Sequence, residues 1–343
     1  MSSVIGVDLG GTKAVVACLR GNQLSESTLE PTDRSASAAL IDQLAAMVDR
    51  IRSDDLAAIG IGVPSIVEFE TGRVVSSVNI PLTDVPLRRV LGERLGVPVF
   101  VDNDATVAAL AEAHDSELRL VAQNLVMITI GTGVGGGIVL GGRIYRGATG
   151  GAGELGHTIV GLGLDDSKHV PEPGERFPQP GSLEFVAAGH ALDRLAAACA
   201  REHPDSALGQ LRAQGKPVLG AEAVEAAQAG DPAAAHTVEL WAERVGIGIA
   251  NAINTFDPEE VVIGGGAARA GDLLLEPARR VALKYVVPGL GRRTSIRLAW
   301  HGVRAGVLGA ALLAAHEVEA SAAGDRVNGP AATLNAHEEA SGS

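Results

Sequence analysis

Several common sequence features are scarce or missing in this chain. Its two cysteines, Cys18 and Cys199, stand alone and far apart, which excludes a disulfide framework and a cysteine-based zinc knuckle. No apolar run approaches the roughly 18 residues of a transmembrane helix. The opening MSSVIGVDLGG has neither a basic segment nor a long apolar run, so it does not resemble a secretory signal. We therefore expect a cytoplasmic protein that makes no membrane contact.

Positive charge and aromatic residues are also scarce. The net charge is -13, only 3% of residues are aromatic, and no basic stripe or tail occurs, which argues against nucleic acid as a partner. An acidic chain can still bind ATP, because backbone amides and a metal ion hold phosphates locally. What the sequence does contain is 46% hydrophobic residues and 44 glycines in 343 residues. This composition predicts an α/β protein with room for two domains, each with its own core.

One pattern of strand, glycine turn and strand occurs twice, over 3–24 and again from about 124. Each copy is followed by segments with helical or strand periodicity. We expect helices over 36–53, 85–96, 105–114, 183–202, 220–254 and 302–319, and strands over 56–68, 97–101 and 259–264. This internal duplication predicts domains at 1–118, joined by a C-terminal helix at about 302–318, and at 119–301, with a disordered tail over 320–343. Small ligands commonly bind between such domains.

The glycine turns admit two interpretations. GTGVGG at 131–136 formally matches the dinucleotide motif, but that motif needs a helix after its third glycine, and an alternating hairpin follows here. The turns could be tight turns only. However, DLGGT at 8–12 and GTGVGGG at 131–137 hold equivalent places in the two halves, and amides in such turns bind anions. With a third glycine cluster at 263–271 and Asp8 as a possible magnesium ligand, the turns favour a nucleotide.

Four stretches resemble the ROK family of sugar kinases and related repressors. They are IGVDLGGTK, VDNDATVAALAE, ITIGTGVGGGIVLGGRIYRGATGGAGELGH and FDPEEVVIGGGAARAG, and the resemblance runs from about residue 4 to 316. It implies a duplicated hexokinase–actin (ribonuclease H-like) α/β fold with two domains flanking a cleft. It also implies ATP and Mg²⁺ as cofactors, a hexose as substrate, and a homodimer or higher homo-oligomer. The family's repressors carry an N-terminal helix-turn-helix domain, for which a phosphate loop starting at residue 8 leaves no room, so a kinase is expected.

The resemblance assigns roles to individual residues. The implied nucleotide ligands are Asp8 (also toward Mg²⁺, directly or through water), Gly10, Gly11, Thr12, Lys13, Gly131, Thr132, Gly133, Gly135, Gly264, Gly265 and Gly266. The implied sugar ligands are Ser65, Asn79, Asn103, Asp104, Glu154, His157 and Glu184. Structural roles stay open for some of them: Glu154 and His157 could be a surface pair, and Glu184 could simply begin a helix. Glucose is the expected sugar, with fructose, mannose, N-acetylhexosamine or allose as alternatives, polyphosphate as an alternative donor, and a non-catalytic sugar sensor as the other class.

The sequence departs from the family pattern in two places. Ser65 stands where family members usually have glycine, which could alter the choice of sugar. The segment 161–184 contains no cysteine, whereas most bacterial members have a zinc motif there, and Ser182 occupies the place of its last cysteine. Zinc needs three or four closely spaced ligands. We therefore expect no structural zinc, and another group must orient His157.

The stretch VDNDAT combines three polar residues between a strand and a helix. We assign Asp102 a strand-end or capping role and Asn103 a sugar hydroxyl. Asp104, by the resemblance, is the general base that accepts the proton of the sugar hydroxyl. Aspartate is also favoured at a helix start, so capping and catalysis are compatible.

Overall fold

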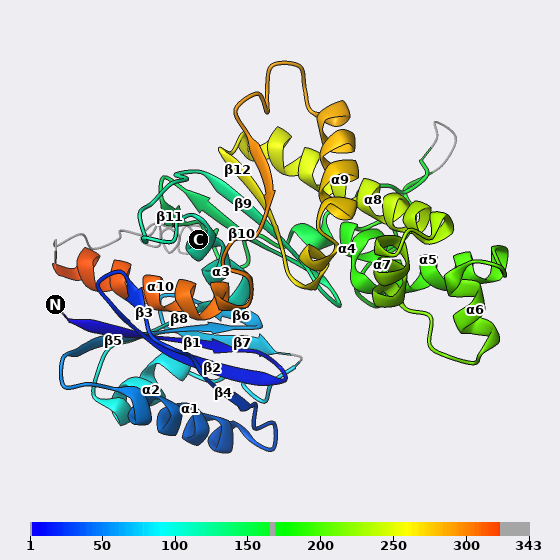
Figure 1. The fold of residues 1–343 in the computed structure, drawn as a ribbon. Helices are drawn as coiled ribbons and strands as arrows, with labels where there is room; N and C mark the ends of the chain where they lie inside the picture. Colours follow the sequence, from blue (N-terminus) through cyan, green and yellow to red (C-terminus); the bar gives the residue numbers. More distant parts are fainter. Residues whose placement is uncertain (1, 78, 165–168, 323–343) are drawn as a thin grey trace, which may run out of the picture.

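The structure is a computed structural model that describes residues 2–77, 79–164 and 169–322, and it contains two α/β bodies (Figure 1). In the first body the strands lie in the order β3-β2-β1-β5-β8, with β4 also paired to β2. Their bounds are β1 (Ser3–Leu9), β2 (Lys13–Arg20), β3 (Gln23–Leu24), β4 (Thr28–Pro31), β5 (Leu56–Val63) and β8 (Val99–Asn103). A separate hairpin, β6 (Ser65–Glu68) with β7 (Arg73–Ser77), follows β5.

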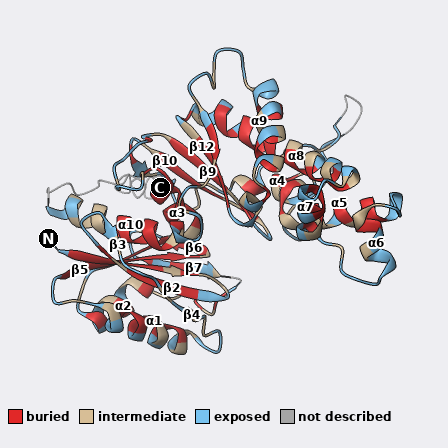
Figure 2. Cartoon of the chain, in the orientation of Figure 1, coloured by how far each residue is buried: buried red, intermediate tan, exposed pale blue. Residues whose placement is uncertain are grey.

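Helices cover both faces of this first sheet (Figures 1 and 2). The helices α1 (Ser37–Ile51) and α2 (Leu87–Leu95) bury their apolar sides in one core, whereas α3 (Asp104–Glu112) and α10 (Ala305–Ala322) share another. The C-terminal helix α10 packs directly on the central strands, because a Cβ on Gly6 or Gly60 would overlap its backbone. Helix α10, although it follows the second sheet in the chain, therefore belongs to the first sheet.

The second body repeats the plan of the first. Its sheet has the order β11-β10-β9-β12-β13, formed by β9 (Leu125–Ile130), β10 (Val134–Leu140), β11 (Arg143–Ile144), β12 (Glu260–Gly264) and β13 (Ser295–Leu298). In both bodies an antiparallel hairpin lies beside two parallel strands. The duplication inferred from the two glycine turns is therefore present in the sheets themselves.

Of the remaining helices, three contact the second sheet: α4 (Leu183–Ala187), α8 (Pro232–Phe256) and α9 (Asp272–Tyr285). The helices α5 (Gly189–Glu202), α6 (Ala207–Ala213) and α7 (Gly220–Gln228) pack on α8 or on one another. The short 3-10 helices η1 (Leu155–His157) and η2 (Gly266–Ala270) contact the sheet, whereas η3 (Gly302–Arg304) contacts α10. The shared core of α4 to α9 centres on the buried Trp241 of α8, whose indole N–H donates to the carbonyl of Ala187 at 2.7 Å.

Three sequence predictions of elements need correction. The helix predicted over 183–202 is two helices, because Ala188 is extended and the Gly189 amide donates to the carbonyl of Gly131 at 2.8 Å. The helix predicted over 220–254 is broken where Gly230 has φ +92° and Asp231 caps α8. Residues 320–322 of the predicted tail are helical, and 323–343 lie outside the described residues.

Within the described ranges, no helix has the length and hydropathy needed to span a bilayer.

Candidate active site

The stretch VDNDAT forms the end of β8 and the start of α3. Asn103, not Asp102, is the N-cap residue: its side-chain oxygen accepts from the amides of Ala105 and Thr106 at 2.9 and 3.1 Å. Asp104 is the first helical residue, and its carboxylate accepts from the Ala105 amide at 2.8 Å. Capping the helix this way holds Asp104 in one orientation at the edge of the sheet.

Asp102 is buried and has a different partner. Its carboxylate accepts a hydrogen bond from Nε of Arg146 at 2.7 Å. Arg146 follows β11 and so belongs to the second body. The Arg146 guanidinium also lies over the ring of Phe69, 3.4 Å from the centroid. The strand-end position expected for Asp102 is correct and the capping role is not, because its carboxylate is engaged in this ion pair. Arg146 was not identified from the sequence, because its contact depends on how the two bodies pack.

The Asp104 carboxyl has an unusual protonation equilibrium. Burial, helped by the negative charges of Asp8 and Glu154, raises its pKa to about 6, against the hydrogen bond from the Ala105 amide, which lowers it. A carboxyl with a pKa near neutrality is suited to accept a proton in catalysis. The influence of Glu154 also shows that residues of both bodies face Asp104.

The first glycine turn joins β1 and β2 beside this carboxyl. The Gly10 amide donates to the carbonyl of Lys13 at 2.9 Å, and Thr32 Oγ1 donates to the carbonyl of Gly10 at 2.7 Å. Thr12 and Lys13 are exposed at the turn. A Cβ on Gly11 would lie 3.1 Å from the Cβ of Asn79, which places the Asn79 backbone against the turn.

Asp8 lies on β1 just before this turn. Its carboxylate packs against Gly306 of α10, where an added Cβ would lie 2.5 Å from the carboxylate. Burial raises the pKa of Asp8, against the charge of Lys13. The charge of Asp8 also raises the pKa of the Asp104 carboxyl, so the two carboxylates lie near each other. A hard divalent cation prefers oxygen ligands, so Asp8 is suited to hold Mg²⁺. Gly306 was not identified from the sequence, because its role depends on α10 returning to β1.

The second glycine turn joins β9 and β10. The Val134 amide donates to Glu184 Oε2 at 2.7 Å, and a Cβ on Gly133 would lie 2.5 Å from the same oxygen. Gly131 and Thr132 are exposed at the tip. Glu184 does begin a helix, α4, and its carboxylate also supports this turn. The role of Glu184 as a sugar ligand stays a prediction.

The third glycine cluster lies beside the second turn. Gly264 ends β12 opposite Thr129 of β9, and Gly266 begins η2. Between them Gly265 has φ +78°, and an added Cβ there would overlap the carbonyl of Ile130. Only glycine permits this close approach of β12 to the end of β9. The two clusters thus form one continuous glycine surface in the second body.

Of the residues predicted to bind the sugar, Asn103, Ser65 and Glu154 lie near Asp104. Asn103 Nδ2 donates to the carbonyl of Ser65 at 3.4 Å, and Glu154 acts electrostatically on Asp104. The Ser65 Oγ is buried and has no hydrogen-bond partner within the described residues. An unsatisfied buried hydroxyl is costly, so a ligand hydroxyl that reached it would be favoured.

His157 contacts two neighbours. Its Nε2 lies 3.6 Å from Glu154 Oε2, and its ring meets Phe177 edge to face at 5.2 Å between centroids. The expected surface pair with Glu154 therefore exists, and Phe177, from the segment without cysteines, is a further group that orients the imidazole. Ser182 caps α4, accepting from the Phe185 amide at 3.3 Å. The described residues hold no group of three or more metal-ligating side chains, and 165–168 lie outside them, so the absence of zinc stays a prediction.

Comparison with known proteins identifies relatives of this arrangement. Residues 4–317 match the model of the ROK family. The glucokinase of Halalkalibacterium halodurans is 37% identical over 319 residues, covering 89% of this chain and 92% of that protein. The crystal structure of a ROK family glucokinase from Streptomyces griseus in complex with glucose and AMPPNP superposes with a TM-score of 0.73 at 30% identity, covering 92% of this chain and 100% of that one.

A regulator is also similar in structure. A ROK family transcriptional regulator, a homologue of the E. coli MLC protein, superposes with a TM-score of 0.77 at 25% identity. The match covers 91% of this chain and 77% of the regulator. Together the structural relatives confirm the duplicated hexokinase–actin (ribonuclease H-like) α/β fold.

Proposed function

The chain belongs to the ROK family, and from this premise we propose that it is a sugar kinase that transfers the γ-phosphoryl group of ATP to a hexose. The observation that carries the proposal is Asp104, a half-buried carboxyl with its pKa raised to about 6, fixed at the start of α3. Asp8 acts on it electrostatically from the first glycine turn. A binding protein has no need of such a base, whereas a kinase does.

The proposed reaction assigns a task to each group. Asp104 accepts the proton of a sugar hydroxyl, the 6-hydroxyl being the favoured one, as that oxygen attacks the γ-phosphorus. Ser65, Asn79, Asn103, Glu154, His157 and Glu184 bind and orient the sugar. The amides of both glycine turns bind the phosphates, and the glycine cluster 264–266 contacts the adenosine. Asp8 would hold Mg²⁺, which neutralises charge on the phosphates during transfer.

Glucose is the proposed sugar because two glucokinases are among the relatives and one of them was crystallised with glucose and AMPPNP. Fructose, mannose, N-acetylhexosamine and allose remain alternative acceptors within the class, and polyphosphate an alternative donor. The regulator-like neighbour keeps a sugar sensor as the second candidate. We also propose a homo-oligomer, with ATP and a hexose as its small-molecule partners and no nucleic acid as a partner.

ADP release on a panel of hexoses, with ATP and Mg²⁺, tests the proposal. We expect the highest kcat/KM with glucose. Turnover with another hexose and not with glucose would change the proposed substrate but support the proposed kinase activity. Sugar binding without turnover on any hexose would instead establish the sensor.

The raised pKa of Asp104 predicts the pH dependence of the reaction. A general base works only when ionised, so its activity is present above the folded-state pKa and is lost as the pH falls through it. We expect kcat/KM to be level near pH 7–8 and to fall about tenfold per pH unit below about pH 6. Initial rates between pH 4.5 and 8.5 measure this. A profile that stays level down to pH 4.5 would contradict the raised pKa.

The contact of Glu184 with the second glycine turn predicts a donor-side effect. Glu184→Ala removes the acceptor of the Val134 amide, and losing a hydrogen bond to a charged group costs about 1.5–3 kcal/mol. We expect the KM for ATP to rise at least about tenfold, measured at saturating sugar. Glu202→Ala, an exposed change at the end of α5, is the matched control and should leave both KM values unchanged. A rise in the sugar KM alone would mean that Glu184 serves only the sugar.

A further inference from the structure

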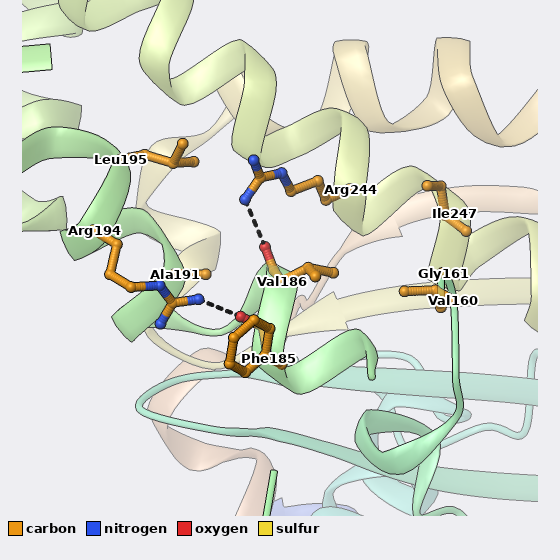
Figure 3. Close-up of a pocket in the computed structure, with 9 residues that line it drawn as sticks. All are labelled: Val160, Gly161, Phe185, Val186, Ala191, Arg194, Leu195, Arg244 and Ile247. Carbon is orange, nitrogen blue, oxygen red and sulfur yellow. Dashed lines mark hydrogen bonds between the residues drawn. The ribbon is translucent and has the colours of Figure 1, made fainter. Parts of the chain in front are cut away.

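A cavity of about 520 Å³ lies in the second body, on the opposite side of α4 from the second glycine turn (Figure 3). It is open to solvent and is bordered by α4, α5, α8 and the segment at 160–161. Apolar side chains, including Val186, Leu195 and Ile247, form much of its wall. Its volume falls within the roughly 300–1,000 Å³ of small-molecule sites.

Two arginines point into this cavity. Arg194 of α5 donates to the carbonyl of Phe185 and lies over its ring, 4.9 Å from the centroid. Arg244 of α8 makes one long hydrogen bond, 3.4 Å, to the carbonyl of Val186 (Figure 3). Within residues 2–77, 79–164 and 169–322, neither guanidinium pairs with a carboxylate.

This arrangement is unusual for the composition of the chain. Carboxylates outnumber Lys and Arg by 41 to 28, yet two cations share a cavity whose lining contains no carboxylate. Burial lowers the pKa of Arg244, and the like charge of Arg194 lowers it further, although a guanidinium remains protonated. Two like charges in a partly apolar cavity repel each other unless an anion lies between them.

We propose that this cavity binds a small phosphate monoester whose body is apolar or uncharged. A phosphate monoester carries close to two negative charges at neutral pH, which matches the two guanidiniums. Arginine presents forked donors that bind phosphate oxygens in pairs. The apolar wall accommodates the body of the ligand. Both arginines donate hydrogen bonds to backbone carbonyls. A bound anion would replace these with stronger, charge-assisted hydrogen bonds.

The position of α4 connects this cavity to the second glycine turn. The carbonyls of Phe185 and Val186 hold the two arginines on one side, while Glu184 holds the Val134 amide on the other. A ligand that draws the arginines from these carbonyls changes the contacts of a five-residue helix. Where the proposed kinase function holds, the ligand therefore alters the affinity for ATP, and this consequence rests on that function.

Binding of phenyl phosphate, followed by isothermal titration calorimetry, tests the proposal without any turnover. Saturating AMPPNP with Mg²⁺ blocks the glycine turns, so that the heat reports on other sites. We expect binding that weakens at least tenfold in Arg194→Met and in Arg244→Met. Arg201→Met, an exposed arginine on the same helix as Arg194, is the control and should bind as the wild type does.

Three outcomes would overturn the proposal. The first is equal binding by the wild type and both variants, or no binding at all. The second is inorganic phosphate that binds as tightly as phenyl phosphate, because the apolar wall would then contribute nothing. The third is that the protein binds no phenyl phosphate and that its oligomer dissociates in the Arg244→Met variant. That result would mean that the cavity is part of a subunit interface. If no hexose were phosphorylated, the proposed kinase function would be wrong, but the result of the phenyl phosphate titration would still stand.

Discussion

Replacing Asp104 by asparagine should abolish phosphoryl transfer while the protein still binds its sugar. Asparagine keeps the size of the side chain and an oxygen for the Ala105 amide, so α3 should start as before. What it loses is the basic oxygen, and general-base assistance is typically worth about 10²–10⁴-fold. We expect kcat for ADP release to fall by at least about 10², with the sugar Kd, from calorimetry, changed less than about threefold.

The neighbouring aspartate provides the matched control. Asp102 lies two residues away, but its carboxylate is buried against Arg146 and does not face the proposed substrates. Asp102→Asn should therefore lower stability, because it removes the nearer of the two carboxylates that pair with Arg146, and should reduce kcat much less than Asp104→Asn does. If Asp104→Asn retains more than about a tenth of the wild-type kcat, the role of general base is wrong.

The sequence was sufficient for features that depend on short-range patterns. The two glycine turns repeat in the chain, and the sheets built from them have the same strand order, so the duplication could be inferred before any contact was known. Strand-then-helix periodicity also located β8 and α3 correctly. The strand β13 was not identified because four residues are too few to show an alternation. The helix α9 was also missed, although Leu274, Ala278 and Val281 are at helical spacing, and Pro277 within it argues against a helix.

Features that depend on distant contacts could not be read from the sequence. Asp102 and Asn103 are adjacent and both suit a helix cap, and only the position of Arg146 decides which of them serves. The contact of Phe177 with His157 likewise depends on the path of the cysteine-free segment. Gly306 accommodates Asp8 only because the last helix returns to the first sheet. Local patterns thus identify the chemical groups, while tertiary packing determines their partners.

The far end of α3 is held by a buried ionic network that joins the two bodies. Glu112 is fully buried and accepts from Arg297 Nη1 at 2.7 Å and from the amides of Trp300 and His301 at 2.9 Å each. Arg297 of β13 also donates to Glu260 at 2.6 and 2.8 Å, and its guanidinium lies 3.4 Å from the centroid of the Trp300 ring. Helix α3 begins at Asp104 and ends at Glu112, and it is therefore fixed to the second body at its last residue.

Arg297→Met should consequently be among the most destabilising single substitutions in this chain. It leaves the carboxylates of Glu112 and Glu260 buried without their cation, and breaking a buried pair in this way costs about 3–5 kcal/mol. The free energy of unfolding, from urea titration followed by circular dichroism, should fall by that amount. Arg280→Met is the control, because Arg280 pairs with Glu239 at the exposed surface, where such pairs contribute about 0–1 kcal/mol. A loss below about 1 kcal/mol for Arg297→Met would show that this network contributes little to joining the bodies, and that the position of α3 does not depend on it.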